Sequence, residues 1–275
     1  MDLLGSFTQL TIGYSIEQLV IGYIMGILVG LTGIGAGILA MPAMIFFAHL
    51  DSVSAIGTSL FFSVLSRIYG VRQHWKMGFI DQETNFYFSL GAVPTVLLAS
   101  YEINYLKTIM NPETLDYYMR TFLSGTVFVV AIYLAWDAFK KNQSDLYKCG
   151  DPLMPSQKAN GVLFGGIIGG IVGATSIGGG VFIIPILTGV FKLSAKCVVG
   201  TSNMISVALT LIGSGVYIFY GNVNYAVAIL VAAGSLPGIK LGAGLAQRLS
   251  NVALKKIIAG LALISLMSMM ASIKH

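Results

Sequence analysis

LTGIGAGILAMP (residues 31–42) and ATSIGGGVFIIP (residues 174–185) are two glycine-rich stretches, each set inside a long apolar region and each ending in proline. Glycine adopts positive φ at little steric cost and lets another group approach the backbone closely. Both stretches are therefore predicted to contain turns between apolar helices. We refer to residues 31–37 as the first tip and to residues 174–180 as the second tip.

The two tips belong to an internal repeat of 143 residues. Sliding the sequence by this distance aligns residues 22–98 with residues 165–241 without a gap, and about 21 of the 77 pairs are identical. The identities include Gly26 with Gly169, Gly35 with Gly178, Pro42 with Pro185, Gly57-Thr58-Ser59 with Gly200-Thr201-Ser202, and Pro94 with Pro237. Residues that control backbone geometry are thus repeated, and duplicated halves are typical of secondary transporters.

The chain is strongly apolar and carries few charges. Of its 275 residues, 56% are hydrophobic and 10% are charged, against about 25% charged in soluble domains. Six windows lack Asp, Glu, Lys and Arg: between Glu17 and Asp51, Glu83 and Glu102, Arg120 and Asp137, Lys158 and Lys192, Lys196 and Lys240, and Lys256 and Lys274. A span needs about 20 apolar residues. An integral membrane protein is therefore predicted, and the net charge of +5 does not indicate nucleic-acid binding.

Windows and tips divide each half into five helical segments. We expect them at 16–33, 36–48, 52–74, 84–101 and 117–139, and again at 159–175, 179–191, 195–219, 224–245 and 252–273. The second segment of each half covers only about 20 Å of a hydrocarbon core about 30 Å thick, so the first two segments are predicted to form a short or re-entrant hairpin with the tip at its turn. The expected fold class is an all-α polytopic membrane protein: one transmembrane domain over 1–275, with repeat 1 at 16–139 and repeat 2 at 159–273.

Basic residues favour hairpins over broken single spans. If each half begins with a hairpin, eleven basic residues lie on one side of the membrane and three lie on the other. The eleven are Arg72, Lys76, Lys140, Lys141, Lys148, Lys158, Lys192, Lys196, Arg248, Lys255 and Lys256, and the three are Lys107, Arg120 and Lys274. Broken single spans would divide the same residues evenly, so the positive-inside rule selects the hairpins. The linker 140–158 is then cytoplasmic, both termini lie outside the inner (plasma) membrane, and the two halves are inverted relative to each other.

Each tip also predicts a ligand site. A turn inside the membrane leaves backbone N–H groups without helical partners, and the next helix carries a partial positive charge at its N-terminus. Such groups need a wet cavity or a bound anion. Small hydroxyl residues flank the tips and can donate hydrogen bonds to an oxyanion. The predicted substrate-binding residues are Thr32, Gly33, Gly35, Gly37, Thr58, Ser59, Thr175, Ser176, Gly178, Gly179, Gly180, Thr201, Ser202 and Asn203.

Two charged residues, Arg67 and Lys240, lie inside predicted spans near the cytoplasmic ends. Their side chains either snorkel to the interface or, together with His74, line a vestibule that attracts anions. The interfacial belt is the simpler interpretation of His74, which stands beside a tryptophan and two basic residues.

Other features have structural interpretations. Small residues at helix-packing spacing occur at Gly22, Gly26 and Gly30. Cys149 and Cys197 are too few for a disulfide framework and have no neighbour at metal-ligand spacing, so both are expected to be unpaired thiols. The linker 140–158 has no periodicity and is expected to be a solvated tether.

Several classes of function find no support in the spans. Their interiors offer no Asp or Glu, no His pair and no Cys cluster, so no metal, cofactor or cation permease is predicted. Ser176 lacks the G-x-S-x-G spacing of a hydrolase nucleophile, and no histidine lies in the membrane interior, so an enzyme is not expected. A purely structural membrane subunit stays open as an alternative, and a homo-oligomer is compatible with the sequence.

Taken together, these features resemble the TauE/SafE family of sulfite and organosulfonate exporters. The resemblance covers nearly the whole chain and rests on the two tips with their prolines, the Gly-Thr-Ser triplets at 57 and 200, the segment HWKMGFID (74–81) and the duplication. It implies a permease that exports sulfite, sulfoacetate or another organosulfonate by alternating access, with a small anion and the lipid bilayer as partners. A passive anion channel on the same scaffold is the alternative. Gly33 and Ala36 stand where the second tip has Ser176 and Gly179, so equal contributions from the two tips are not expected.

Overall fold

The computed structural model describes residues 12–32, 37–138, 149–177, 180–246 and 260, and these residues form helices and no strand. The helices are α2 (Ile12–Thr32), α3 (Gly37–Phe46), α4 (Ser52–Lys76), α5 (Gln82–Ile109), α6 (Pro112–Ala138), α7 (Pro155–Thr175), α8 (Ile183–Gly189), α9 (Ala195–Phe219) and α10 (Tyr225–Ala246). The predicted segment 252–273 lies outside the described residues, apart from Gly260.

Five of the described helices are long and apolar enough to cross a membrane. They are α2, α5, α7, α9 and α10, and each contains a window of at least 18 residues with high mean hydropathy. The fold class predicted from the sequence, an all-α polytopic membrane protein, is therefore confirmed.

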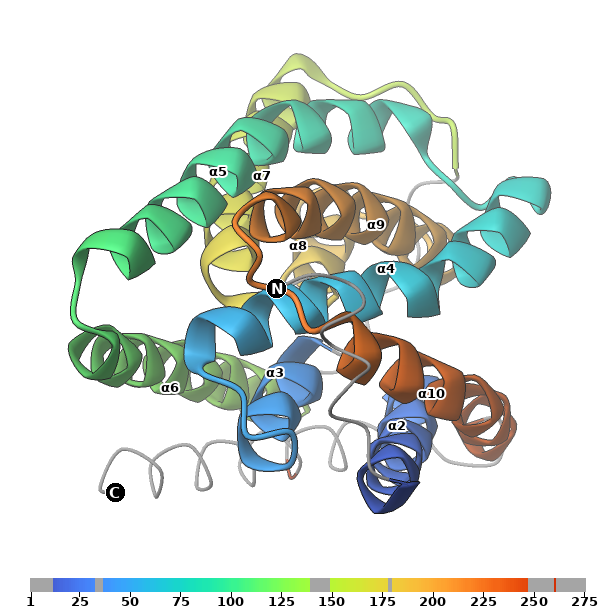
Figure 1. Cartoon of the computed structure of the whole chain (residues 1–275). Coiled ribbons are helices and arrows are strands. Elements are labelled where there is room, and N and C mark those ends of the chain that lie inside the picture. The colour runs from blue at the N-terminus through green and yellow to red at the C-terminus, as the bar shows by residue number, and fades with distance from the viewer. Residues whose placement is uncertain (1–11, 33–36, 139–148, 178–179, 247–259, 261–275) are drawn as a thin grey trace.

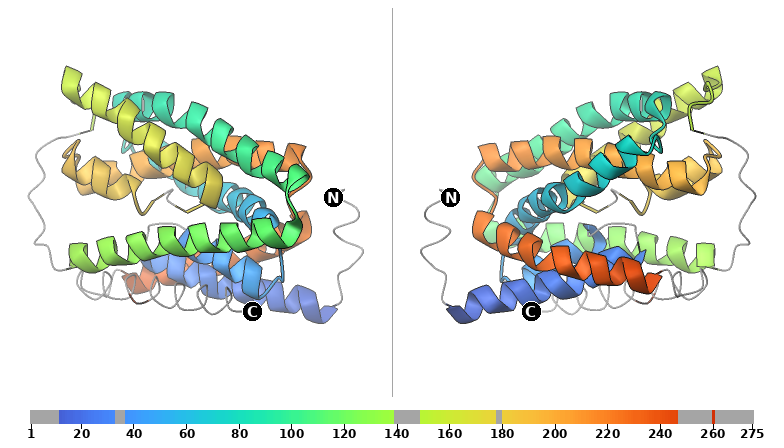
Figure 2. Two further views of the ribbon diagram at one scale, coloured as in Figure 1. Left: turned by 90° about the vertical axis from the view of Figure 1, so that its left-hand side faces the viewer. Right: turned by 90° about the vertical axis from the view of Figure 1, so that its right-hand side faces the viewer.

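Helices from the two halves of the chain are interleaved. Figures 1 and 2 show α2 beside α10 on one side and α5 beside α7 on the other, with α4 and α9 between these two pairs. Each outer pair thus joins one helix from the first half to one from the second. The two central helices, α4 and α9, also pack against each other, so the middle of the molecule lies at the boundary between the halves.

Contacts between the halves recur at the 143-residue offset. The hydroxyl oxygen of Thr58 accepts a hydrogen bond from the backbone N–H of Asn224 (2.9 Å), and that of Thr201 accepts one from the backbone N–H of Asp81 (2.9 Å). The positive φ of Gly78 (69°) is likewise matched by that of Gly221 (70°). The duplicated sequence therefore produces duplicated local geometry. The inverted orientation of the halves in a bilayer stays a prediction.

Close helix contacts explain some of the repeated glycines. A Cβ added at Gly26 would collide with the backbone carbonyl of Ser235 on α10, and one added at Gly169 would collide with that of Ala92 on α5. Gly22 faces the backbone of Val231 in the same way. The packing role predicted for Gly22 and Gly26 is confirmed, because a side chain at either position would push the helices apart.

The helix after each tip is too short to cross a membrane. Helix α3 has 10 residues and α8 has 7, which correspond to about 15 Å and 10 Å of helix. Both are shorter than the predicted segments 36–48 and 179–191. In the second half the difference arises because residues 180–182 form a turn before α8 begins.

Helix α5 is longer than the charge pattern predicts, since it continues from residue 101 to Ile109. The polar residues in this extension are satisfied by contacts rather than by water alone. Asn104 is fully buried and donates to the carbonyl of Ser100 (2.7 Å), and Lys107 pairs with Asp51 (2.8 Å). Tertiary partners therefore extend the helix past the point where its sequence becomes polar.

The described part of the linker is docked by hydrogen bonds, although most of its residues are exposed. The backbone N–H of Gly150 donates to the carboxylate of Asp81 (2.9 Å), that of Leu153 donates to Glu83 (2.8 Å), and Lys158 forms an ion pair with Glu83 (2.6 Å). Helix α7 already begins at Pro155, within the predicted linker. The expectation of a free tether is wrong for residues 149–158, because the N-terminus of α5 offers two carboxylates to the linker backbone.

Cys149 and Cys197 form a disulfide with a Cα–Cα distance of 5.7 Å. The expectation of two unpaired thiols is therefore wrong. Cys149 lies in the docked linker and Cys197 lies in the first turn of α9, 48 residues later. Sequence spacing could not indicate this pair, because folding of the linker onto the α5 and α9 ends is what brings the two residues together.

Candidate functional site

Ser59 of α4 and Ser176 at the end of α7 meet in the interior of the molecule. Their hydroxyl oxygens are 2.5 Å apart, and both residues are buried. Ser59 also lies within 2.9 Å of the carbonyl oxygen of Ile56, to which it donates. With the proton of Ser59 directed to that carbonyl, Ser176 donates to Ser59. Two of the predicted site residues, one from each half, are therefore brought together.

Helix α7 ends abruptly at this contact. Ser176 has a φ of 56°, in the left-handed region, and its backbone N–H closes the last turn by donating to the carbonyl of Val172 (2.8 Å). Thr175 uses its hydroxyl locally: it donates to the carbonyl of Ile171 (2.6 Å) and accepts from the backbone N–H of Ile177 (3.1 Å). Ser176 rather than Thr175 therefore presents its hydroxyl to α4.

A carbonyl in the last turn of α7 is satisfied by residues that the sequence did not single out. The carbonyl oxygen of Gly173 accepts hydrogen bonds from the hydroxyls of Tyr217 (3.0 Å) and Ser100 (3.3 Å). The last carbonyls of a helix have no partner within the helix, so these hydroxyls stabilise the break after α7. Both donors are buried polar residues in otherwise apolar helices, which is the sequence signal that could have identified them.

Thr58 and Thr201 hold the halves together through their hydroxyl oxygens, which accept backbone N–H groups at the starts of α10 and α5. Ser202 donates to the carbonyl of Val199 (3.1 Å) on its own helix, and Asn203 is half-buried on α9. These contacts assign a structural task to the two threonine oxygens. A role in ligand binding for Thr58, Thr201, Ser202 and Asn203 stays a prediction.

The predicted hydroxyl residues do not form one cluster. Ser59 lies in the second turn of α4, and Gly57 nearby packs against Tyr217, close to the C-terminal end of α9. Ser202, by contrast, lies in the second turn of α9 itself. Ser59 lies near the level of Tyr217, and about 15 residues of α9 separate Tyr217 from Ser202. The hydroxyl groups of Ser59 and Ser202 therefore lie about 20 Å apart along the central helices.

Several predicted site residues fall outside the described part of the chain. These are Gly33, Gly35, Gly178 and Gly179, together with the side chain of Thr32. Gly37 is the first residue of α3. Gly180 is buried in the turn before α8, where its carbonyl accepts from the backbone N–H of Ile184 (3.1 Å). Helix α8, which follows the second tip, has only seven residues.

Arg67 lies inside the protein, where only 7% of its surface is exposed. Snorkelling to the membrane interface is therefore the wrong interpretation for this residue. Lys240 is exposed on α10, and His74 is half-buried in the last turn of α4. Arg67 is therefore a charge of the protein interior, and a vestibule that Arg67, His74 and Lys240 line together stays a prediction.

A polar cluster at the opposite end of α4 links the two halves. The ammonium group of Lys107 donates to Asp51 (2.8 Å), Ser54 (3.2 Å) and the amide oxygen of Asn222 (2.9 Å). Asn222 in turn donates to Asn104 (2.6 Å). Burial raises the pKa of the Asp51 carboxyl, but the hydrogen bonds from Lys107 and Ser54 and the charge of Lys107 outweigh it, so the pKa lies below its usual 3.8.

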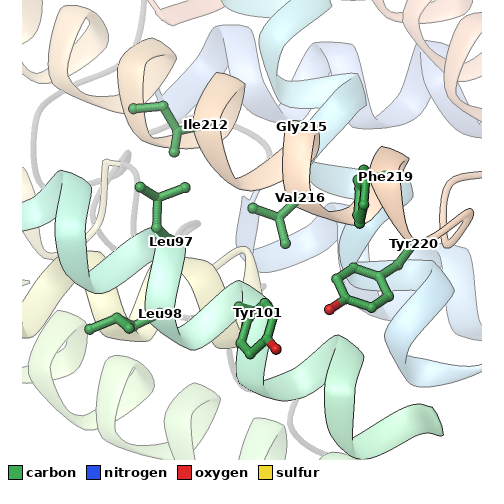
Figure 3. Close-up of a pocket in the computed structure, with 8 residues that line it drawn as sticks. All are labelled: Leu97, Leu98, Tyr101, Ile212, Gly215, Val216, Phe219 and Tyr220. Atoms are coloured by element: carbon green, nitrogen blue, oxygen red, sulfur yellow. The ribbon is translucent and has the colours of Figure 1, made fainter.

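An apolar pocket of about 510 Å³ lies between α5 and α9. Figure 3 shows Leu97 and Tyr101 of α5 facing Val216 and Phe219 of α9 across this pocket. None of its eight lining residues is charged, and none was predicted as a site residue. The pocket therefore does not have the chemistry of an anion site. Among the described residues, no group of three His, Cys, Asp or Glu side chains could hold a metal ion.

Comparison with known proteins agrees with the apolar helices. The family described as "Sulfite exporter TauE/SafE" matches residues 19–269. The chain is 28% identical to the probable membrane transporter protein YjnA of Bacillus subtilis, over 91% of this chain and 98% of that protein. It is 30% identical to the probable membrane transporter protein MJ0441 of Methanocaldococcus jannaschii, over 84% of this chain and 86% of that protein. No solved structure matches the chain. With a family match over nearly its full length, the chain belongs to the TauE/SafE sulfite exporter family.

Proposed function

We propose that the protein is a secondary transporter that exports a small sulfur oxyanion, such as sulfite, sulfoacetate or another organosulfonate, from the cytoplasm across the inner membrane. Membership of the TauE/SafE family and the names of the relatives support a transporter of this class. The observation that carries the proposal is the buried contact between Ser59 and Ser176, because it places two hydroxyl donors from different halves at the break after α7.

The chemistry of this contact suits an oxyanion without a fixed charge at the tip. A hydroxyl can donate one hydrogen bond and accept others. An oxyanion entering between Ser59 and Ser176 would replace two bonds between neutral groups, from Ser176 to Ser59 and from Ser59 to the Ile56 carbonyl, by two bonds to a charged acceptor. Hydrogen bonds to charged groups contribute about 1.5–3 kcal/mol each, so the exchange offsets part of the cost of dehydrating the anion.

Transport requires the contact to open. Thr175, Ser176 and Ile177 are buried in this structure, so this described part of the second tip is closed to solvent. The matched hydrogen bonds of Thr58 with Asn224 and of Thr201 with Asp81 attach the two halves to each other at equivalent positions. In the proposed mechanism one set of helices rocks against the other, with the halves inverted in the membrane. An inside-negative potential favours the exit of an anion by about 2.3 kcal/mol per charge per 100 mV.

Counterflow in proteoliposomes tests this function. Vesicles loaded with unlabelled sulfite and diluted into a trace of ³⁵S-labelled sulfite under anaerobic conditions are expected to accumulate label transiently. A saturable carrier exchanges substrate across the membrane, whereas a passive channel only equilibrates it. Sulfoacetate, sulfate and chloride added as competitors rank the anions. Absence of any flux above empty vesicles for all the sulfur oxyanions would contradict the proposal, and flux without counterflow would establish the channel instead.

A further inference from the structure

Helices α4 and α9 run antiparallel, and three contacts set their register. A Cβ added at Gly57 would lie 2.8 Å from the Cβ of Tyr217, and one added at Gly213 would lie 3.2 Å from Leu60. At the other end of the pair, a Cβ at Gly200 would lie 3.4 Å from the Cβ of His74. Moving forward along α4 therefore corresponds to moving back along α9 by a similar number of residues.

Each of these helices carries a row of buried polar residues four positions apart. Residues at this spacing lie on one face of a helix. The rows consist of Ser59, Ser63 and Arg67 on α4 and of Ser202, Ser206, Thr210 and Ser214 on α9, and none of the seven is more than 7% exposed. The register places Ser63 level with Thr210, and Arg67 level with Ser206. The rows thus form one polar track along the boundary between the halves.

Helix packing accounts for part of this track, since hydroxyl residues are common at interfaces between membrane helices. Thr210 and Ser214 satisfy themselves by donating to carbonyls of their own helix (2.8 and 3.0 Å). Ser206 differs, because its fully buried hydroxyl has no hydrogen-bond partner among the described residues. A buried hydroxyl without a partner is costly, so packing alone does not explain Ser206.

Arg67 is the second feature that packing does not require. A charged side chain buried within membrane-spanning helices is expensive and is generally functional. The repeat gives a direct comparison, because the position equivalent to Arg67 in the second half is Thr210. The duplicated packing is therefore achieved with a threonine there, and the positive charge is an addition specific to the first half.

We propose that Arg67 and Ser206 bind the transported anion at a second station between α4 and α9, about 12 Å along α4 from Ser59. The guanidinium group supplies the charge that selects an anion, and the free hydroxyl of Ser206 donates one further hydrogen bond. The ligand class is a small oxyanion with two or more oxygens, since the planar guanidinium can hold two of them at once. This inference rests on the proposed function.

Concentration-dependent counterflow of ³⁵S-labelled sulfite tests the second station. Arg67→Gln removes the charge, Arg67→Lys keeps it without the planar fork, and Ser206→Ala removes the hydroxyl. Ser66→Ala is the matched control, because its hydroxyl donates to a carbonyl of its own helix (3.2 Å) one position before Arg67. Arg67→Gln is expected to raise KM about 10- to 100-fold and Ser206→Ala about 3- to 10-fold. Arg67→Lys retains part of the affinity, and Ser66→Ala stays within about twofold of the wild type.

Gel-filtration profiles and unfolding temperatures show which variants fold. If Arg67→Gln yields no folded protein, the KM of Ser206→Ala decides, since loss of one unpartnered hydroxyl leaves packing intact. Wild-type transport with an unchanged KM in every folded Arg67 and Ser206 variant would overturn the second station and leave the proposed function standing. A wild-type protein that moves no sulfur oxyanion would overturn both.

Discussion

The hydroxyl oxygens of Ser59 and Ser176 are 2.5 Å apart, although 117 residues separate them in the chain. Ser59 belongs to α4, the second helix after the first tip, and Ser176 belongs to the second tip itself. A contact of this kind crosses the boundary between the halves at the break in a membrane helix. In the proposed mechanism, a relative movement of the halves would open or close this contact.

Replacing Ser176 with alanine is expected to raise the KM for sulfite counterflow about 10-fold or more, because one hydrogen bond to a charged ligand is lost. Ser59→Ala is expected to act in the same direction. Thr188→Ala is a suitable control, since the hydroxyl of this exposed residue donates to a carbonyl of its own short helix (2.8 Å). Unchanged KM values for both serine variants would rule these hydroxyls out as ligands.

Adjacent glycines on α7 allow a sharp test of packing. Gly169→Ala is expected to lower the unfolding temperature in detergent, because the new methyl group would collide with the backbone of Ala92 on α5. Overpacking costs about 1–3 kcal/mol, which exceeds the gain of about 1 kcal/mol from alanine in a helix. Gly170→Ala has no atom within 4 Å of the new methyl group and is expected to be neutral or slightly stabilising. Equal effects at the two positions would contradict the packing of α5 against α7.

The redox state of Cys149 and Cys197 depends on the side of the membrane on which the linker lies. The Cα–Cα distance of 5.7 Å between Cys149 and Cys197 lies within the usual range for a disulfide. Protein purified in air is expected to react with a thiol-specific polymer at both residues only after reduction. Cytoplasmic thiols are kept reduced, and the linker is predicted to be cytoplasmic. In intact cells the disulfide of the structure is therefore expected to be open and to form when the protein is exposed to air, and impermeant reagents are expected to miss both cysteines. Rapid labelling of Cys149 from outside would reverse the predicted orientation.

The ion pair between Asp51 and Lys107 predicts a weak dependence of stability on pH. The pKa of the Asp51 carboxyl is below 3.8 in the folded protein, so the pair contributes fully above about pH 4 and is lost as the pH falls through the lowered pKa. A pair of partly exposed charges contributes at most about 1 kcal/mol. The difference in unfolding temperature between wild type and Asp51→Asn is expected to be present at pH 6 and to shrink at pH 3. A constant difference would show that the carboxylate charge does not stabilise the fold.

Apolar windows and repeated glycines were sufficient to predict most of the fold. Charge-free stretches marked the spans, and the pairing of Gly26 with Gly169 at the 143-residue offset marked the duplication. Helix ends were less predictable. The charge-free window that stops at Glu102 predicted the end of this segment at residue 101, but partners from other elements extend α5 to Ile109.

The candidate site was predicted only in part, because residue type does not reveal which partner a hydroxyl will find. Ser59 and Ser176 meet, whereas the oxygens of Thr58 and Thr201 accept backbone N–H groups of the opposite half. Tyr217 and Ser100 reach a carbonyl of α7 that only the packed helices bring near them. The disulfide between Cys149 and Cys197 was not predicted for the same reason, because only the folded chain brings the two residues together.

The distance between the Ser59 and Ser176 hydroxyl oxygens in a structure determined with saturating sulfite tests the central claim most directly. The account predicts density for the anion between the two residues and an oxygen–oxygen separation greater than about 4 Å, since each hydroxyl would then donate to the anion over a normal hydrogen-bond distance. Sulfite bound elsewhere, with the two serine hydroxyls still in direct contact, would contradict it.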